Sequence, residues 1–128
     1  MYLPPNPFFA KEEKMKKIMK SDILKSVKDK DIGLIRFLYL DSDAMIRGYC
    51  STAEALEGDL EQGHAYAKPM PFFSSLDDIV AGSQFGPVGE VCAMPDPNTF
   101  KILPYKSRSA AMICDFVTMD TLEETGMC

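Results

Sequence analysis

The chain has 128 residues, of which 46% are hydrophobic and 26% charged, a composition typical of one globular domain. Nineteen acidic residues against fourteen basic ones give a formal net charge of −5, which argues against a nucleic-acid-binding surface. The apolar runs are far shorter than a membrane span and the N-terminus lacks the apolar core of a signal peptide, so we expect no membrane partner.

The cysteine pattern argues against a metal centre. The four cysteines show no Cys-x-x-Cys spacing, and the single histidine makes a Cys/His zinc site improbable. Three of the cysteines lie in apolar, strand-like contexts. We therefore expect buried free thiols in a reducing compartment, the cytoplasm.

The first part of the chain predicts an arm followed by a helix. Residues 1–9 contain three prolines, which exclude a regular helix and predict an extended arm whose Phe8 and Phe9 can dock on a neighbouring surface. Residues 10–30 place apolar side chains three and four positions apart with lysines between them, which predicts an amphipathic helix. Ser21-Asp22 favours a helix N-cap and can divide this run into two helices.

The next stretch predicts a hairpin and a second helix. Residues 34–40 alternate so that one face is wholly apolar, as in a central strand covered by a helix, and residues 45–50 form the return strand after a turn at 41–44. Ser51 and Glu54 match a capping box, and the helix they begin is expected to run to about Gln62, where Gly63 stops it.

Residues 64–85 are the least regular part of the chain. Their prolines exclude a long strand, and Phe72-Phe73 marks a hydrophobic anchor. A loop of this length without its own secondary structure is usually functional or mobile.

Residues 86–117 predict three short strands. The runs 88–94 and 99–103 flank a Pro-Asp-Pro-Asn turn and are expected to pair as a hairpin, and the apolar run 110–117 is expected to return alongside.

This region also carries a family resemblance, in the pattern Pro95-Asp96-Pro97-x-Thr99-Phe100-x-x-Leu103-Pro104-Tyr105 followed by Cys114-Asp115. It resembles the N-terminal β-grasp domain of glutamine synthetases over roughly residues 15–118. The lead-in Gly86-Pro87-Val88-Gly89-Glu90 is most similar to the type III glutamate–ammonia ligase branch, which includes γ-glutamylmethylamide synthetase-like enzymes.

The resemblance implies an α+β fold of the β-grasp (ubiquitin-like) class, with a crossing helix and an N-terminal amphipathic helix. We accordingly divide the chain into a Pro-rich arm at 1–9, the β-grasp domain at 10–118 and an acidic tail at 119–128, where the catalytic domain of the family would begin.

The resemblance also implies that the two domains of the family have different roles. The larger catalytic domain of the family supplies the ATP and Mg²⁺ or Mn²⁺ sites and most catalytic residues, and the β-grasp domain completes the active site of a neighbouring subunit. This chain is therefore expected to hold no catalytic, cofactor or metal residue, to be inactive alone, and to need a catalytic domain in cis or in trans. A homo-oligomer is possible.

The active-site loop of the family, Phe-Asp-Gly-Ser-Ser, is matched best by residues 63–70. Tyr66 stands for the aromatic residue, but Ala67 takes the place of the ammonium-binding aspartate. A cation site needs a counter-charge, so the departure puts ammonia in doubt and suits an alkylamine such as methylamine better.

Three further residues are candidates for an active-site-facing position. Asp77 and Asp78 can supply the missing carboxylate, although a solvated turn explains them as well. Arg108 can reach a phosphate or carboxylate, and it also fits an ordinary surface arginine.

A different reading of the same sequence is a free-standing binding or regulatory module that docks on a synthetase subunit, because a β-grasp fold does not fix function.

Overall fold

The computed structural model describes residues 18–82 and 86–126, so the predicted arm and residues 10–17 of the predicted N-terminal helix lie outside the described residues. The elements in chain order are α1 (Lys20–Asp29), β1 (Leu34–Leu40), β2 (Ile46–Thr52), α2 (Leu56–Gln62), β3 (His64–Ala67), η2 (Met70–Phe72), β4 (Glu90–Pro95), η3 (Pro97–Thr99), β5 (Lys101–Ile102) and β6 (Ser109–Val117).

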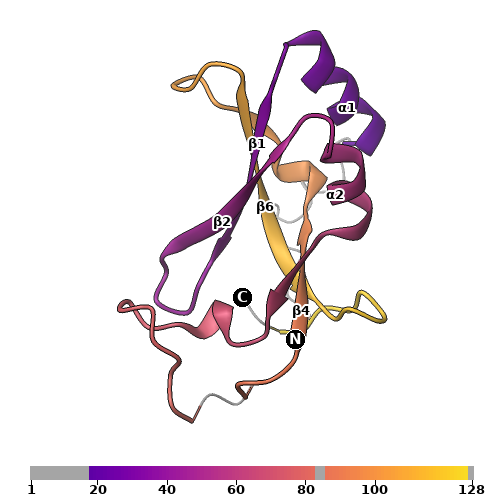
Figure 1. Ribbon diagram of the computed structural model, residues 1–128. Coiled ribbons are helices and arrows are strands. Elements are labelled where there is room, and N and C mark those ends of the chain that lie inside the picture. Colours follow the sequence, from indigo (N-terminus) through magenta and orange to yellow (C-terminus); the bar gives the residue numbers. More distant parts are fainter. Residues whose placement is uncertain (1–17, 83–85, 127–128) are drawn as a thin grey trace, which may run out of the picture.

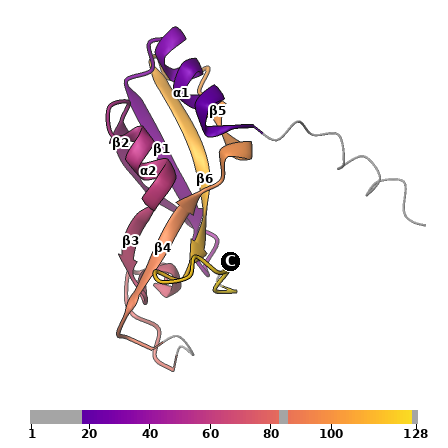
Figure 2. The same ribbon diagram turned by 90° about the vertical axis from the view of Figure 1, so that its right-hand side faces the viewer.

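The strands form one mixed sheet in the order β2-β1-β6-β4-β3, with β5 paired to β6 (Figure 1). β1 runs antiparallel to β2 and parallel to β6, so the first and last strands are neighbours in the middle of the sheet. Both α1 and α2 lie on one face of it (Figures 1 and 2). The predicted α+β class is confirmed.

Alternation in β1 defines the core face, as predicted. Ile35, Phe37 and Tyr39 are buried towards the helices, and the residues between them lie on the opposite face. The other elements contribute the remaining large core side chains, which include Ile23, Val27, Leu56, Leu60, Met112 and Phe116. The core therefore lies between the sheet and the two helices.

Aromatic contacts bring the two edges of the sheet together. Tyr49 of β2 stacks on His64 of β3 with ring centroids 4.1 Å apart, although four strand pairings separate β2 from β3. On its other side Tyr49 stacks on Phe37 at 4.9 Å. The sheet is therefore curled.

The N-cap residues predicted for two helices, Ser21-Asp22 and Ser51, were wrong. α1 begins at Lys20, and Met19 holds the N-cap position instead of Ser21 or Asp22; the Met19 amide donates to the Asp22 carboxylate at 3.3 Å. In the second case β2 continues through Thr52 and α2 begins only at Leu56, so the capping box does not form. The predicted end of α2 at Gln62, followed by Gly63, is confirmed.

The predicted hairpin between 88–94 and 99–103 was also wrong. β4 pairs with β3 and β6, and β5 pairs with β6. The Asp96 amide donates to the Ile113 carbonyl and the Ile113 amide donates to Thr99 Oγ1, both at 2.8 Å. These bonds tie the turn to β6, so the chain passes along β6 instead of reversing onto β4. The return of the third run alongside is confirmed.

Two smaller expectations also need correction. The irregular stretch begins later than predicted, because residues 64–67 form β3. Of the cysteines, Cys92 and Cys114 are buried free thiols as predicted, but Cys50 is exposed because it lies on the exposed face of β2, whose burial alternates along the strand.

Candidate functional site

A buried carboxylate organises the turn between β1 and β2. Asp41 is 4% exposed and accepts hydrogen bonds from the amides of Asp43 and Met45, both at 2.9 Å. It also accepts from Arg47 Nε at 2.5 Å. The Arg47 hydrogen bond, followed by the two amide bonds, holds the pKa of Asp41 below its usual range.

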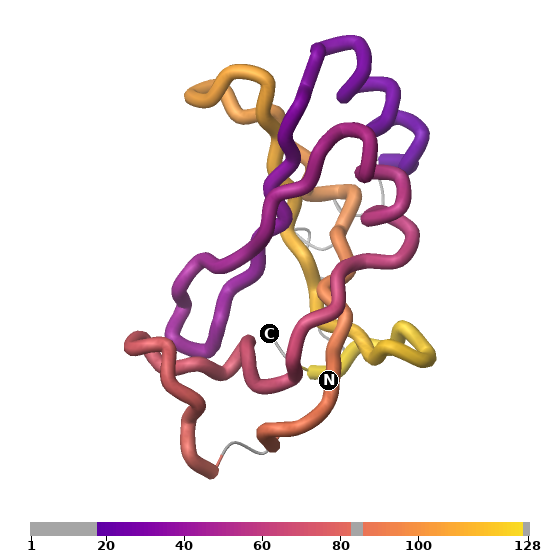
Figure 3. Tube along the Cα trace, viewed as in Figure 1, coloured from indigo at the N-terminus to yellow at the C-terminus, as the bar shows by residue number. Residues whose placement is uncertain are grey.

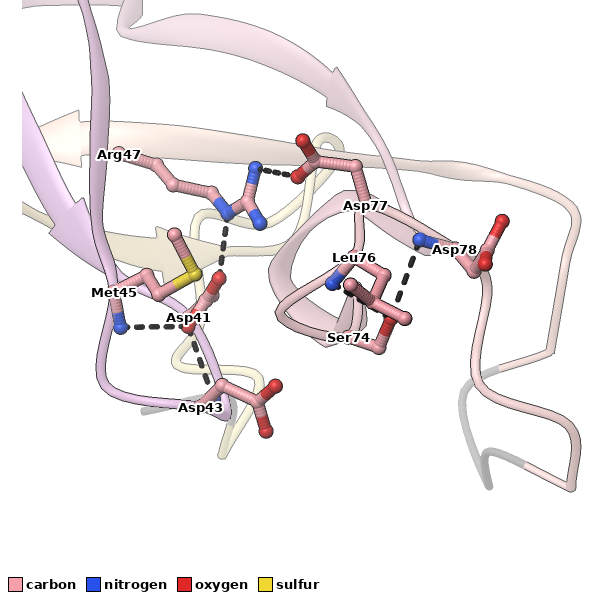
Figure 4. A network of polar contacts seen from close by, with 8 residues as sticks. All are labelled: Asp41, Asp43, Met45, Arg47, Ser74, Leu76, Asp77 and Asp78. Atoms are coloured by element: carbon pink, nitrogen blue, oxygen red, sulfur yellow. Dashed lines mark hydrogen bonds and ion pairs between the residues drawn. The ribbon is translucent and has the colours of Figure 1, made fainter.

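Arg47 links this turn to a loop thirty residues further along the chain (Figure 4). Its Nη1 lies 2.6 Å from the Asp77 carboxylate, and its guanidinium carbon lies 5.9 Å from the centre of the Phe73 ring. Figure 3 shows the segment after β3 returning beside the β1–β2 turn, where the Ser42 amide donates to the Pro71 carbonyl at 3.0 Å. We call the Asp41–Arg47–Asp77 group the clamp.

The clamp holds an ordered turn, residues 73–79. Ser74 Oγ accepts from the amides of Leu76 and Asp78, at 3.2 and 3.3 Å, and Phe73 forms a β-bridge with Ile79. Asp77 has φ +61°, a left-handed conformation that costs free energy for any residue but glycine. The turn presents Leu76, which is 81% exposed, at its surface.

A polar hollow of about 490 Å³ lies at the same end of the sheet. Its lining comes from β3–β4 and from the tail after β6, and includes Lys68, Glu90, Asp120, Glu124 and Thr125. Ala67 lies directly opposite Glu90 in the β3–β4 register. Cross-strand partners share one face, with Cβ atoms about 5 Å apart. A carboxylate therefore stands next to the position where the resemblance leads us to expect an aspartate.

The structure separates the four predicted site residues. Asp77 and Asp78 lie together in the 73–79 turn, but Asp77 is engaged by Arg47. Tyr66 is buried against Tyr39, with ring centroids 5.3 Å apart, and burial raises the pKa of its hydroxyl.

Arg108 lies at the opposite end of the sheet, beside the start of β1. Its Nε is 3.0 Å from the Asp31 carboxylate, and its carbonyl accepts from the amides of Gly33 and Leu34. These contacts give Arg108 a role in joining α1 to the sheet.

Sequence reasoning missed Arg47 and Glu90. Arg47 follows the predicted turn at 41–44, and its position six residues after Asp41 on the return strand was the available signal. Glu90 becomes a neighbour of Ala67 only through the pairing of β3 with β4, which no local pattern revealed.

The described residues offer no ligand set for a metal ion: no three His, Cys, Asp or Glu side chains converge within 18–82 and 86–126. Within the same residues, no helix is long and apolar enough to cross a membrane.

Comparison with known families decides the classification. The sequence profile described as "Glutamine synthetase N-terminal domain" matches residues 19–127. The chain belongs to this glutamine synthetase family of N-terminal domains.

Curated glutamine synthetases are similar over the same region. The enzyme of Mycobacterium tuberculosis (strain ATCC 25618 / H37Rv) is 26% identical over 106 residues, which cover 79% of this chain and 22% of the relative. That of Methanosarcina mazei is 28% identical over 94 residues, covering 73% of this chain and 19% of the relative. The chain thus spans about a fifth of the length of these synthetases.

Solved structures share the fold. A GmaS–ADP complex matches with a TM-score of 0.57 and 21% identity, covering 74% of this chain and 20% of that one. A structure titled as a novel glutamine synthase homolog matches with a TM-score of 0.63 and 22% identity, covering 76% and 24%. The β-grasp-like architecture is therefore confirmed, and each matched region is one part of a larger protein.

Proposed function

We propose that this chain is the β-grasp part of an ATP-dependent glutamate–ammonia or glutamate–amine ligase and completes the active site of a neighbouring subunit. The supporting observation is the family match over residues 19–127 in a chain that spans about a fifth of its synthetase relatives. The clamp, the 73–79 turn and the polar hollow together form the end of the domain that faces the neighbour.

The surface of that end suits burial against a partner. Leu76 and Val88 are 81% and 82% exposed and Ile79 is 55% exposed, while hydrogen bonds and the clamp fix the backbone of the 73–79 turn. Exposed apolar side chains on an ordered turn bind with little loss of conformational entropy.

Within this proposal the catalytic domain holds ATP and Mg²⁺ or Mn²⁺; in residues 18–82 and 86–126 of this chain, no three His, Cys, Asp or Glu side chains converge as ligands for a metal ion. When bound there, the metal and nucleotide supply phosphoryl transfer to glutamate. The role of this chain is to cover the active site of the catalytic domain and to present polar groups to the amine. Because the three cysteines of the described residues are free thiols, we place the ligase in the cytoplasm.

Within this proposal, Glu90 supplies the counter-charge for the amine. Asp77 is committed to Arg47, whereas the exposed Glu90 carboxylate lines the hollow and adjoins Ala67. The methyl group of Ala67 leaves an apolar contact for an alkyl substituent, so we expect both ammonium and methylamine to bind.

The test is complementation. We expect the chain, mixed with a separately produced glutamine synthetase catalytic domain, to restore phosphate release that depends on ATP, glutamate and an amine. Association of the two halves without release for either ammonium or methylamine would contradict the ligase function.

Glu90→Gln tests the assignment of the counter-charge. We expect it to raise KM for the amine about tenfold, the equivalent of 1.4 kcal/mol, with little change in KM for glutamate. Asp78→Asn is the matched control and should leave both constants unchanged. Equal amine KM values for Glu90→Gln and the unmodified chain would show that Glu90 is not the counter-charge for the amine.

The exposed apolar residues of the turn also favour a second candidate, a regulatory module that docks on a synthetase. In that case adding the chain to an assembled synthetase lowers its activity, and Leu76→Asp abolishes the effect. An unchanged activity at saturating chain would exclude this candidate.

A further inference from the structure

A pocket of about 350 Å³ lies at the end of the sheet opposite the clamp. It opens where the end of α1, the start of β1, the β2–α2 connection and the β5–β6 turn meet, and we call it the α1 pocket. The seven residues of β1 separate it from the clamp by about 20 Å. Small-molecule sites span about 300–1,000 Å³, so the α1 pocket has room for a small ligand.

The lining of the α1 pocket has an apolar wall and a charged rim. The wall consists of four buried or half-buried apolar side chains, Leu24, Val27, Ile32 and Ala53. The rim consists of two cations and two anions, all exposed: Lys28, Arg108, Asp31 and Glu54. A ligand that carries only negative or only positive charge would meet two like charges on this rim. A zwitterion matches both signs.

Asp31 holds the Arg108 guanidinium by one edge. Arg108 Nε lies 3.0 Å from one carboxylate oxygen of Asp31, and Nη2 donates to the other at 3.2 Å. Nε also donates to the Asp31 carbonyl at 3.1 Å. The second edge of the guanidinium, formed by Nη1 and the remaining N–H of Nη2, has no partner among the described residues. This edge has the geometry that binds a carboxylate through two parallel hydrogen bonds.

The backbone at Arg108 gives a further reason to assign its side chain a binding role. Arg108 has φ +54°, a left-handed conformation that favours glycine. Its carbonyl accepts from the amides of Gly33 and Leu34, a contact that a glycine at this position would supply equally. The ion pair with Asp31 contributes little stability, because the two side chains are 65% and 82% exposed. The structural contacts therefore leave the choice of arginine unexplained.

We propose that the α1 pocket binds a free α-amino acid with an aliphatic side chain. The ligand carboxylate binds the open edge of Arg108 beside Lys28, and its ammonium group binds Glu54. Its side chain lies against the apolar wall. Because α1, β1 and the β5–β6 turn all contribute to the pocket, the bound ligand stabilises the docking of α1 on the sheet. The proposal is independent of the ligase function, since it concerns the other end of the domain.

The test is a titration of the full chain with L-leucine, followed by amide NMR spectra. We expect saturable shifts at Gly33 and Ala53, whose backbones are joined by a hydrogen bond beside the pocket. Leucinamide lacks the carboxylate and 4-methylpentanoate lacks the ammonium group. Each should bind at least about tenfold more weakly than L-leucine.

Variants locate the site. Arg108→Lys keeps the charge but loses the paired donors, and should raise the Kd for L-leucine about tenfold. Gly33→Ala should also raise it without changing a charge, because the added Cβ would lie 3.5 Å from Arg108 Nη2. Lys28→Gln should weaken binding, whereas Lys30→Gln, an exposed lysine that does not line the pocket, is the matched control and should not.

Circular dichroism checks the fold of each variant, and Gly33→Ala and Lys28→Gln keep the test available if Arg108→Lys unfolds. Absence of shifts at about 10 mM L-leucine would overturn the proposal. So would equal Kd values for L-leucine and 4-methylpentanoate, or the same shifts with inorganic phosphate at lower concentration, because the pocket would then bind anions and not zwitterions.

Discussion

Asp41 combines burial with full hydrogen bonding at a turn, where most carboxylates are solvated. It accepts two backbone amides and Arg47 Nε, so its ionised form is stabilised by every neighbour described above. Removing its charge leaves Arg47 partly buried without its main partner, a more costly change than the loss of an exposed ion pair.

Asp41→Asn should therefore lower stability and weaken its dependence on pH. The pKa of Asp41 is depressed in the folded state, so its contribution is present above the unfolded value of about 3.9 and is lost as pH falls through the folded value. Urea titrations between about pH 5 and pH 2 should show a flatter decline in the variant than in the unmodified chain.

Asp43→Asn is the control, since the Asp43 side chain is exposed in the same turn. The raised pKa of Asp115 changes the free energy of unfolding with pH in the opposite direction. This contribution is common to all three proteins and does not affect the comparison. Parallel titration curves for Asp41→Asn and the unmodified chain would show that the clamp contributes nothing to acid sensitivity.

The thiols should differ strongly in reactivity. Cys50 is exposed, whereas burial raises the pKa of Cys92 and raises that of Cys114 to about 12. In a Cys128→Ser background we expect one thiol to react quickly with Ellman's reagent at pH 8 and two to react only in urea. Mass spectrometry should locate the fast label at Cys50; rapid labelling of three thiols would contradict the described burial.

Among the elements, α2 depends on the residue that ends it. Gly63 has φ +65°, and a Cβ there would lie 2.5 Å from Cys92 Sγ and 2.8 Å from the Ala93 carbonyl oxygen. Gly58, inside the same helix, has open space around such an atom.

Gly63→Ala should lower the free energy of unfolding by more than about 1 kcal/mol, and Gly58→Ala should raise it by about 0.5–1 kcal/mol. Urea unfolding measures both. Equal effects of the two substitutions would show that the turn into β3 tolerates a side chain and that the close approach of β4 is not required.

The 73–79 turn should loosen when the clamp is removed. Without the guanidinium, the turn loses its ion pair at Asp77 and the contact over Phe73, so we expect Arg47→Met to speed hydrogen exchange at Leu76 and Asp78 by about tenfold. The exchange rates at these two amides in Arg47→Lys should lie between those of Arg47→Met and the unmodified chain. The exchange rates of the β6 amides should be the same in all three proteins. Identical exchange at the turn in all three proteins would mean that the Ser74 hydrogen bonds and the Phe73–Ile79 bridge order it without the clamp.

Local sequence patterns predicted where secondary-structure elements lie better than they predicted which elements pair with each other. The alternation of β1 and the stop at Gly63 depend on adjacent residues and were predicted correctly. The pairing of β5 with β6 depends on a bond from Ile113 to Thr99, fourteen residues away, and it was predicted wrongly. At the candidate site Asp77 was predicted, but its partner Arg47 and the position of Glu90 opposite Ala67 follow from tertiary contacts alone.

At the scale of the whole molecule, Tyr49 holds the curled sheet closed. It stacks between Phe37 and His64, while its hydroxyl is buried with no hydrogen-bond partner among the described residues, and burial raises its pKa. The ring, and not the hydroxyl, is what joins the edges.

Tyr49→Ala should therefore cost about 3 kcal/mol of unfolding free energy, and Tyr49→Phe should change it by less than about 1 kcal/mol. Guanidinium unfolding gives both values, and the ring resonances of His64 should shift only in the alanine variant. A large loss in Tyr49→Phe would show that the hydroxyl has a polar partner after all.

The parallel pairing of β1 with β6 sets a constraint on biosynthesis. Leu34 pairs with Ser109, 75 residues later, so the central strand cannot be completed until nearly the whole domain has been translated. At about 5–20 residues per second the ribosome needs about 4–15 s to make that stretch. During this interval the edge of β1 that will receive β6 stays open beside its finished hairpin and is exposed to pairing with another polypeptide.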